Sequence, residues 1–365
     1  MLVYIHVPFC ARRCSYCDFA IAVRKEIPSQ SFAHLIGQEW RLRQSLPWWS
    51  TSPEVETVYF GGGTPSRLDP QALDQILREI AAVRTVVAGA EITLEANPDD
   101  VSPERAEAWR RMGINRVSLG AQSFDPAVLE WMHRTHSADQ IGRAVGLLRA
   151  AGFDNISVDL IYGLPEELAR NWPADFSRAL ELAPEHLSLY ALTVESGTPL
   201  GKWTTRGSVR PLPDDRVADE YLWAHERLEQ AGFEHYEVSN AGRPGFHARH
   251  NAGYWERKPF IGLGPSAHGG AGRERMWNLR EWESWRRTMA AGTDPVGGRE
   301  ELTGPQLELE ERYLGLRTSA GVAEALVPGP HRSRWLEQGW AKVREGRVYL
   351  TPEGWLRLDA LVAAV

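Results

Sequence analysis

The amino-acid sequence predicts an α/β fold in which a parallel sheet of six βα units is followed by a smaller C-terminal α+β region. Short runs rich in β-branched residues alternate with helical stretches of about 10–15 residues, a pattern typical of βαβ units and a parallel sheet. Three helical stretches end in a glycine followed closely by a strand, at Gly113, Gly152 and Gly232. A glycine at such a position adopts the left-handed conformation that stops a helix.

The first half of the chain supplies the six predicted strands. They cover residues 3–7, 55–60, 91–95, 116–120, 156–161 and 186–192. Helices are expected between them at residues 70–87, 103–112, 138–151 and 167–182. Six units are too few for a closed eight-fold barrel, and sites in barrels of this class form at the carboxyl ends of the strands.

The chain is predicted to divide into three regions, residues 1–195, 196–300 and 301–365. The middle region begins with a linker rich in Gly, Pro and Thr, and continues with a helix, a strand near residues 235–239 and a Gly/His-rich loop to about residue 272. The last region has helix, turn, helix, a hairpin turning at Glu345-Gly346 and a final helix, which suggests a winged-helix-like cap. Its mixed charge argues against DNA binding.

Composition excludes several classes of protein. The chain has 365 residues, 43% of them hydrophobic and 24% charged, which is ordinary for a globular protein. A net charge of −7 argues against a nucleic-acid binder that relies on phosphate contacts. No apolar run is long enough for a membrane span, and the first strand leaves no room for a signal peptide. We therefore expect a cytoplasmic protein.

All three cysteines lie in one short segment, at Cys10, Cys14 and Cys17, with the spacing C-x3-C-x2-C. Three thiolates are one too few for a closed zinc site or for a fully protein-ligated [4Fe–4S] cluster. A cluster bound here would leave one iron open to an outside ligand. A zinc site completed by His6 and three inert buried thiols are the alternatives. The odd number of cysteines disfavours a disulfide framework.

Polar residues mark the ends of several predicted strands. The second strand runs into Gly61-Gly62-Gly63-Thr64, where missing Cβ atoms would let a ligand approach the backbone. Glu95, Gln122 and Asp159 belong to the third, fourth and fifth strands. A carboxylate inside an apolar strand is costly unless it is paired or bound. Three polar residues on successive strands facing one mouth favour a binding site over isolated structural groups.

The cysteine spacing resembles the motif of the radical S-adenosylmethionine (SAM) superfamily. The resemblance implies a partial (β/α)6 barrel and a [4Fe–4S] cluster held by the three cysteines. It also implies that SAM binds the open iron, and that an electron donor reduces the cluster so that SAM yields a 5′-deoxyadenosyl radical. From Tyr4 to about Leu358 the chain further resembles the oxygen-independent coproporphyrinogen III oxidases and the related HemW-type haem chaperones.

That resemblance assigns residues to two SAM sites. Tyr4, Gly62 and Glu95 would contact the cluster-bound SAM. The residues that would match a second SAM site, known in the oxidase group, are Tyr16, Gly63, Thr64, Gln122, Arg134 and Asp159. No catalytic residue is assigned.

Two departures separate the oxidases from the chaperones. The oxidase motif continues with another cysteine where this chain has Phe19, and the chaperones share the segment Asp18-Phe19. The segment His250-Asn251-Ala252-Gly253-Tyr254-Trp255 matches the chaperones' H-N-x-x-Y-W motif, and Leu314-Gly315-Leu316-Arg317 fits their C-terminal domain. The resemblance favours a chaperone that passes haem to an acceptor haemoprotein. A respiratory haemoprotein is the expected acceptor. Oxidative decarboxylation of coproporphyrinogen III to protoporphyrinogen IX and a zinc-binding interaction protein are the alternatives.

The H-N-x-x-Y-W segment is the predicted haem site, in a Gly-rich loop outside the barrel. Imidazole is a common haem ligand, so His250 would bind the iron, and Tyr254 and Trp255 would pack on the macrocycle. Asn251 would orient the imidazole or the loop. A loop histidine bonded to backbone is the alternative, and His247 and His268 are the nearest rival ligands. There is no C-x-x-C-H motif for covalent attachment of a c-type haem.

Overall fold

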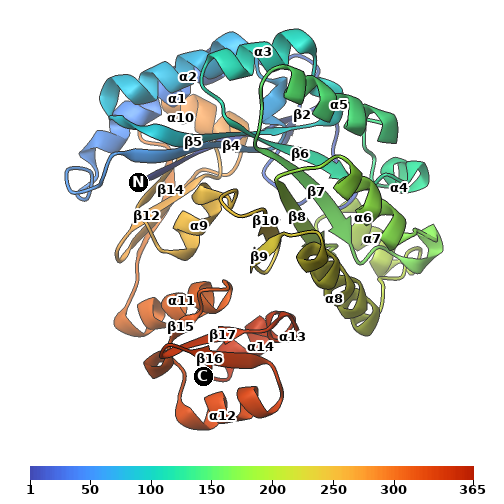
Figure 1. The fold of residues 1–365 in the computed structure, drawn as a ribbon. Helices are drawn as coiled ribbons and strands as arrows, with labels where there is room; N and C mark the ends of the chain where they lie inside the picture. The colour runs from blue at the N-terminus through green and yellow to red at the C-terminus, as the bar shows by residue number, and fades with distance from the viewer.

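The computed structural model describes residues 1–365. Its centre is a curved sheet in which six parallel strands lie side by side in the order β1-β4-β5-β6-β7-β8 (Figure 1). These strands are β1 (Leu2–Val7), β4 (Val55–Gly62), β5 (Val86–Ala96), β6 (Arg116–Gln122), β7 (Ile156–Tyr162) and β8 (His186–Ala191). The predicted partial (β/α)6 barrel is therefore confirmed.

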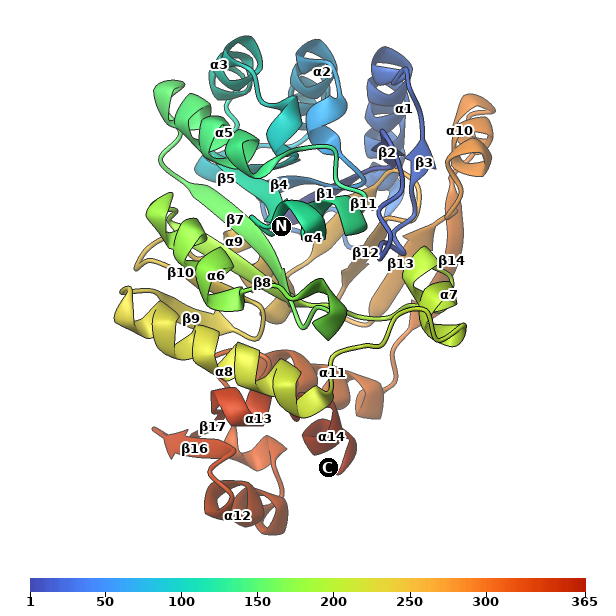
Figure 2. The same cartoon turned by 90° about the vertical axis from the view of Figure 1, so that its right-hand side faces the viewer.

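Helices cover the convex face of this sheet (Figure 1). They are α1 (Ser29–Leu42), α2 (Pro70–Val83), α3 (Pro103–Arg111), α5 (Ala138–Ala150), α6 (Trp172–Glu181) and α8 (Asp214–Gln230). The short helices α4 (Pro126–Trp131) and α7 (Pro199–Thr205) lie at the open end instead (Figure 2), where the Leu200 N–H donates to the Ser15 carbonyl. In α2 the buried residues Leu73, Ile76 and Ile80 recur at helical spacing and face the sheet. The predicted extension of this helix to residue 87 is wrong, because Val86 already pairs with Val55 as the start of β5.

Glycine ends three of the helices, as predicted. Gly113, Gly152 and Gly232 have φ values of +99°, +88° and +79°. The N–H group after each glycine donates to a carbonyl in the last turn, as from Ile114 to Trp109 at 3.1 Å. In each case the hydrogen bond caps the last turn of the helix, and the glycine turns the chain back toward the sheet.

The region after residue 195 continues the sheet at both edges, to twelve strands in all. The added strands are β9 (Glu234–Glu237), β10 (Asn240–Gly242), β11 (Phe260–Leu263), β12 (His268–Ala271), β13 (Glu274–Asn278) and β14 (Val296–Glu301). β10 pairs with β8, and β11 lies parallel to β1. The expected Gly/His-rich loop is wrong, since these residues form helix α9 (Arg249–Trp255), β11 and β12. The predicted boundary at residue 195 does not coincide with a break in the sheet.

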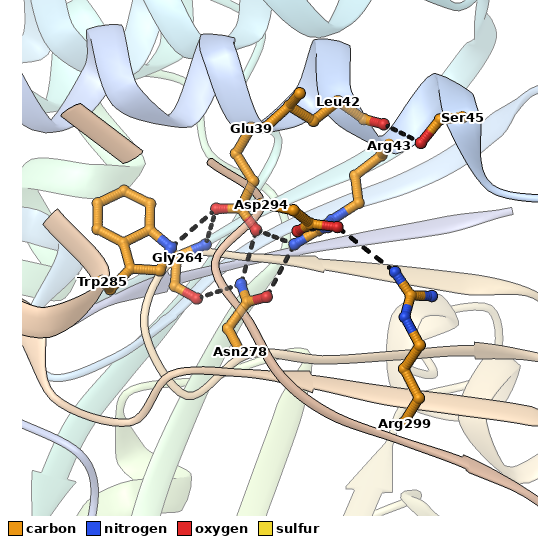
Figure 3. Close-up of polar contacts among 9 residues, drawn as sticks. All are labelled: Glu39, Leu42, Arg43, Ser45, Gly264, Asn278, Trp285, Asp294 and Arg299. Carbon is orange, nitrogen blue, oxygen red and sulfur yellow. Dashed lines mark hydrogen bonds and ion pairs between the residues drawn. The ribbon is translucent and has the colours of Figure 1, made fainter. Parts of the chain in front are cut away.

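A buried polar cluster fastens this extension to α1 (Figure 3). The carboxylate of Glu39 accepts hydrogen bonds from the backbone N–H of Gly264 at 2.8 Å and from the Trp285 indole at 3.1 Å. It also accepts from Asn278 at 2.6 Å and pairs with Arg43. Trp285 lies on α10 (Trp282–Ala290), so a single carboxylate joins α1 to β11, β13 and α10.

The C-terminal residues form a separate small unit below α8 and α9 (Figures 1 and 2). Its helices are α11 (Gly304–Leu316), α12 (Gly329–Glu337), α13 (Pro352–Trp355) and α14 (Leu358–Ala363), and its sheet has β15 (Val322–Ala323), β16 (Ala341–Arg344) and β17 (Arg347–Leu350). Glu345 and Gly346 both have positive φ, as a two-residue hairpin turn requires. This arrangement of helices and hairpin is the predicted winged-helix-like unit. None of the helices in the protein has the length and apolarity needed to cross a membrane.

Candidate functional site

A cavity of about 470 Å³ opens at the carboxyl ends of the parallel strands. Its volume lies within the usual range of small-molecule sites. It brings together most of the residues predicted for the cluster and SAM. They are Cys10, Cys14, Tyr16, Cys17, Gly62, Gly63, Thr64, Glu95, Gln122, Arg134 and Asp159.

The cysteines are positioned by the loop between two short strands. Cys10 ends β2 (Phe9–Cys10), which pairs with β3 (Ala22–Val23), and the loop between them carries Cys14 and Cys17. The hydroxyl of Thr64 donates to the Cys10 sulfur at 3.4 Å. Burial raises the pKa of the Cys10 thiol and raises that of Cys17 to about 11. Metal binding at this loop would therefore displace protons from the thiols.

The donor set fits a cluster better than a single metal ion. No group of three His, Cys, Asp or Glu side chains is arranged to hold one ion. His6 is committed elsewhere, since its Nδ1 lies 3.1 Å from the Tyr4 hydroxyl and its Nε2 lies 2.9 Å from the Ala20 carbonyl. In a cluster each thiolate binds its own iron, so the three sulfurs need not converge on one point. The zinc alternative with His6 as fourth ligand therefore has no support in the geometry.

The glycines after β4 are required by the protein's own packing. Gly62 has a φ of +109°, and a Cβ there would lie 2.6 Å from the His6 ring. A Cβ on Gly63 would lie 2.9 Å from the backbone carbonyl oxygens of Val7 and Phe9. The end of β4 thus packs directly against the backbone that leads to Cys10. Access for a ligand is not the first reason for these glycines.

Glu95 is placed at the junction of β4 and β5. Its carboxylate accepts hydrogen bonds from the Tyr59 hydroxyl at 2.8 Å and from the Gly62 backbone N–H at 3.0 Å. Burial raises the pKa of Glu95 to about 7, and the two hydrogen bonds oppose that shift. A carboxylate held in this way suits an amino group in a ligand. Sequence reasoning missed Tyr59, although alternation along β4 places it on the same face as Gly61.

Arg134 and Gln122 leave polar groups without partners in the cavity wall. Arg134 donates to the Asn97 side chain at 2.6 Å and to the Gly120 carbonyl at 2.8 Å, yet its Nε is buried and unpartnered. Gln122 has a φ of +68°, and its Oε1 is also buried and unpartnered. Buried polar atoms without a partner are uncommon and costly, so this wall suits a polar ligand. Asn97, which sequence reasoning missed, lies two residues after Glu95.

Asp159 is satisfied within the barrel. Its carboxylate accepts from the Ser118 hydroxyl at 3.0 Å and from the Ser157 hydroxyl at 3.2 Å. Burial raises the pKa of Asp159, and the serine hydroxyls counter that shift. Burial also raises the pKa of Tyr16 in the same cavity. Both residues therefore present fixed polar groups to any ligand in this space.

A second cavity of about 390 Å³ adjoins the first. Gly62, Glu95, Asp18 and Phe19 line both. Its other lining residues are Tyr4, His6, Ala20, Tyr254, Phe260, Ser266, His268 and Arg280. Tyr4, predicted for SAM, therefore faces this smaller cavity rather than the larger one.

His250 does not lie in an accessible loop, and that expectation is wrong. It lies on α9, inside the curve of the barrel, and is 1% exposed. Its Nδ1 lies 2.7 Å from the Thr57 hydroxyl, and its Nε2 lies 2.9 Å from the Tyr254 hydroxyl. Burial lowers the pKa of the imidazole to about 3. Both ring nitrogens are therefore engaged, and iron could bind one of them only by displacing Thr57 or Tyr254.

The remaining residues of the H-N-x-x-Y-W segment face different surroundings. Tyr254 lines the smaller cavity and packs edge-on against Phe260, with ring centres 5.0 Å apart. Trp255 lies under the guanidinium of Arg317, 4.6 Å from its ring centre. Asn251 is half-buried on α9 and lines neither cavity. The structure therefore does not gather these four side chains around one space.

Comparison with known proteins identifies the family of the chain. The Radical SAM superfamily matches residues 4–179. The chain is 37% identical to "Heme chaperone HemW" of Mycobacterium tuberculosis over 99% of this chain and 93% of that protein. It is 31% identical to "Heme chaperone HemW" of Bacillus subtilis over 96% and 95% of the two chains. A mouse relative, "Radical S-adenosyl methionine domain-containing protein 1, mitochondrial", is 36% identical over 88% and 74%.

The fold has a close counterpart among solved structures. Coproporphyrinogen III oxidase (HemN) from Escherichia coli superposes with a TM-score of 0.82, over 99% of this chain and 89% of that one, at 19% identity. At that identity the likeness shows the fold alone. The assignment to a family within the superfamily rests on the sequence relatives. The chain belongs to the radical SAM superfamily and, within it, to the HemW family of heme chaperones.

Proposed function

We propose that this protein is a haem chaperone that carries a [4Fe–4S] cluster and SAM, binds haem as its cargo and passes it to an acceptor haemoprotein. Relatives named heme chaperones match almost the whole chain, which supports the role. The observation that carries the cofactor assignment is the single cavity lined by the three thiols and by Glu95, Gln122 and Arg134. Those groups supply the donors that a cluster and a charged small molecule need.

Each cofactor would have its own part of this cavity. Cys10, Cys14 and Cys17 would hold the cluster, and Glu95 with the backbone of Gly62 would hold the amino end of SAM. The cluster, when bound, supplies single electrons to SAM. Glu95 is already oriented by Tyr59, so the carboxylate needs no rearrangement to accept a charged amino group. Gln122 and Arg134 would supply the polar contacts of a second SAM.

The cluster loop is accessible to a partner protein. Arg12 and Arg13, between Cys10 and Cys14, are exposed, and Phe19 is 58% exposed. A donor that reduces the cluster can therefore approach from this side. The acceptor would meet the same mouth of the barrel, and a respiratory haemoprotein is the acceptor to try first.

The test is a set of anaerobic measurements on the full-length protein. Reconstitution should give about four irons and four sulfides per chain, as the cluster type requires, and calorimetry should detect SAM binding. Haem should bind and then move to an apo-haemoprotein. Protoporphyrinogen IX formed from coproporphyrinogen III at enzymatic turnover would instead support the oxidase, which Phe19 in place of a cysteine disfavours. A reconstituted protein that neither binds nor transfers haem would refute the proposal.

A further inference from the structure

We infer that haem binds in the smaller cavity, with its iron on His268 and its propionate edge toward Arg280. This inference rests on the proposed function and gives the cargo a location. It differs from the sequence-based expectation, which placed the iron on His250. The two assignments predict different mutational results.

His268 is the histidine in this cavity whose ring is free. It lies at the start of β12, is exposed, and makes no hydrogen bond through either ring nitrogen. His6 lines the same cavity, but Tyr4 and Ala20 occupy both of its nitrogens. Partial burial lowers the pKa of His268, which favours the neutral imidazole, the form that coordinates a metal. Iron can therefore bind His268 without breaking an existing contact.

The surroundings of His268 suit a flat apolar ring. Tyr254 and Phe260 pack edge-on in the cavity wall, and Trp277 lies across from His268 on β13 with ring centres 6.1 Å apart. Phe19, 58% exposed, stands on the rim that both cavities share. An exposed phenylalanine is unfavourable in water, and a macrocycle packed on it would remove that cost.

One cation at the rim matches the acidic edge of haem. The exposed guanidinium of Arg280 donates only to the backbone carbonyl of Asp18, at 3.0 Å. Its remaining N–H groups are available to a carboxylate, which Arg binds in a two-pronged geometry. Glu95 lies elsewhere in the lining, where Tyr59 and Gly62 engage its oxygens. A propionate would therefore meet Arg280 at the open side.

An open binding site in which one histidine coordinates the haem iron also suits a protein that must release its cargo. Because Phe19, His268 and Arg280 of its lining are exposed, part of the macrocycle would remain in solvent, where an acceptor can reach it. It adjoins Gly62 and Glu95, so the cargo would lie beside the predicted SAM. His250 would have to give up a buried hydrogen bond, to Thr57 or to Tyr254, before one of its nitrogens could bind iron.

His133 is the rival that the experiment must exclude. It lines the larger cavity, packs edge-on against Trp203 with ring centres 5.8 Å apart, and forms no hydrogen bond through its ring. It lies near Arg134 on the other side of the cluster loop. The larger cavity also offers cations, because the exposed Arg12 donates only to the Arg134 carbonyl and the Nε of Arg134 has no partner. The three cysteines predicted to hold the cluster line that cavity as well, so haem on His133 would lie beside the cluster.

The test is anaerobic haem titration of the reconstituted full-length protein and of four alanine variants, at His268, His133, His250 and the exposed His34 of α1. His268→Ala should weaken haem binding by at least about tenfold, the factor that about 1.4 kcal/mol represents, and should shift the Soret maximum. Added imidazole should restore the wild-type spectrum of that variant. Arg280→Ala should weaken haem binding but leave binding of haem dimethyl ester unchanged.

His34→Ala should behave like wild type in every measurement. An unchanged spectrum and affinity in His268→Ala would overturn the inference, as would a loss confined to His133→Ala or His250→Ala. These results leave the chaperone role intact, because the wild-type protein would still bind haem. If the wild-type protein itself binds no haem, the proposed function is overturned and this inference with it.

Discussion

Replacing Glu39 by alanine should loosen the sheet extension that carries the smaller cavity. Glu39 is fully buried and Arg43 is 1% exposed, and the two form an ion pair within α1. The same carboxylate holds the backbone of Gly264 and the side chains of Asn278 and Trp285 (Figure 3). Gly264 leads into the turn before His268. Loss of the hydrogen bonds made by Glu39 should therefore disturb the lining of the smaller cavity.

The size of the effect follows from what alanine leaves behind. Removing one partner of a buried ion pair costs about 3–5 kcal/mol, because the other charge stays buried without compensation. Arg43 keeps Asp294 at 2.8 Å and the Asn278 side-chain oxygen at 2.8 Å, so the lower part of that range is expected. At about 2.1 cal/mol/K of unfolding entropy per residue, a loss of about 3–5 kcal/mol would lower the Tm of a 365-residue chain by about 4–7 °C, and the lower part of that range, about 4–5 °C, is expected.

The assay is thermal and urea unfolding of Glu39→Ala beside a control on α2, whose Glu79 pairs with Arg41 of α1. Glu79→Gln breaks the Arg41–Glu79 pair, whose side chains are 45% and 31% exposed. An exposed pair contributes about 0–1 kcal/mol, so the control should unfold almost like wild type. Haem affinity should fall in Glu39→Ala while the iron and sulfide content stays normal. Equal stability losses in the two variants would refute the argument that this buried cluster fastens the extension.

Three further predictions concern the cofactors. Cys14→Ala should abolish the charge-transfer absorption of the cluster at about 400 nm, and a variant that retains about four irons per chain would contradict the ligand assignment. Glu95→Gln should weaken SAM binding but keep the cluster. Because Glu95 becomes charged as the pH rises through about 7, SAM affinity measured by calorimetry should increase across that range in wild type and stay flat in the variant. His250→Ala should lower the free energy of unfolding by about 1–3 kcal/mol, because it leaves the Thr57 and Tyr254 hydroxyls without a hydrogen-bond partner. If the variant binds haem with the affinity of the wild type, the role of His250 is structural and it does not ligate the iron.

Short local patterns of residues were enough to predict several features of this protein. The alternation of apolar runs and helices predicted the six parallel strands, and Gly113, Gly152 and Gly232 marked where three helices end. The spacing of Cys10, Cys14 and Cys17 placed all the thiols on one short loop. Glu345-Gly346 determined the hairpin of the C-terminal unit. In each case a few neighbouring residues decide the local conformation, so distant contacts were not needed.

Which polar side chains remain available for a ligand depends instead on contacts between distant parts of the chain. His250 loses both ring nitrogens to contacts, and one of these comes from Thr57, which is 193 residues away in the chain. β11 has only four residues, and its place beside β1 depends on a partner at the other end of the sequence. Sequence periodicity predicts which face of a helix or strand is apolar, but it does not identify the element that packs against that face. The free ring of His268 and the blocked ring of His250 therefore became distinguishable only once the chain had folded.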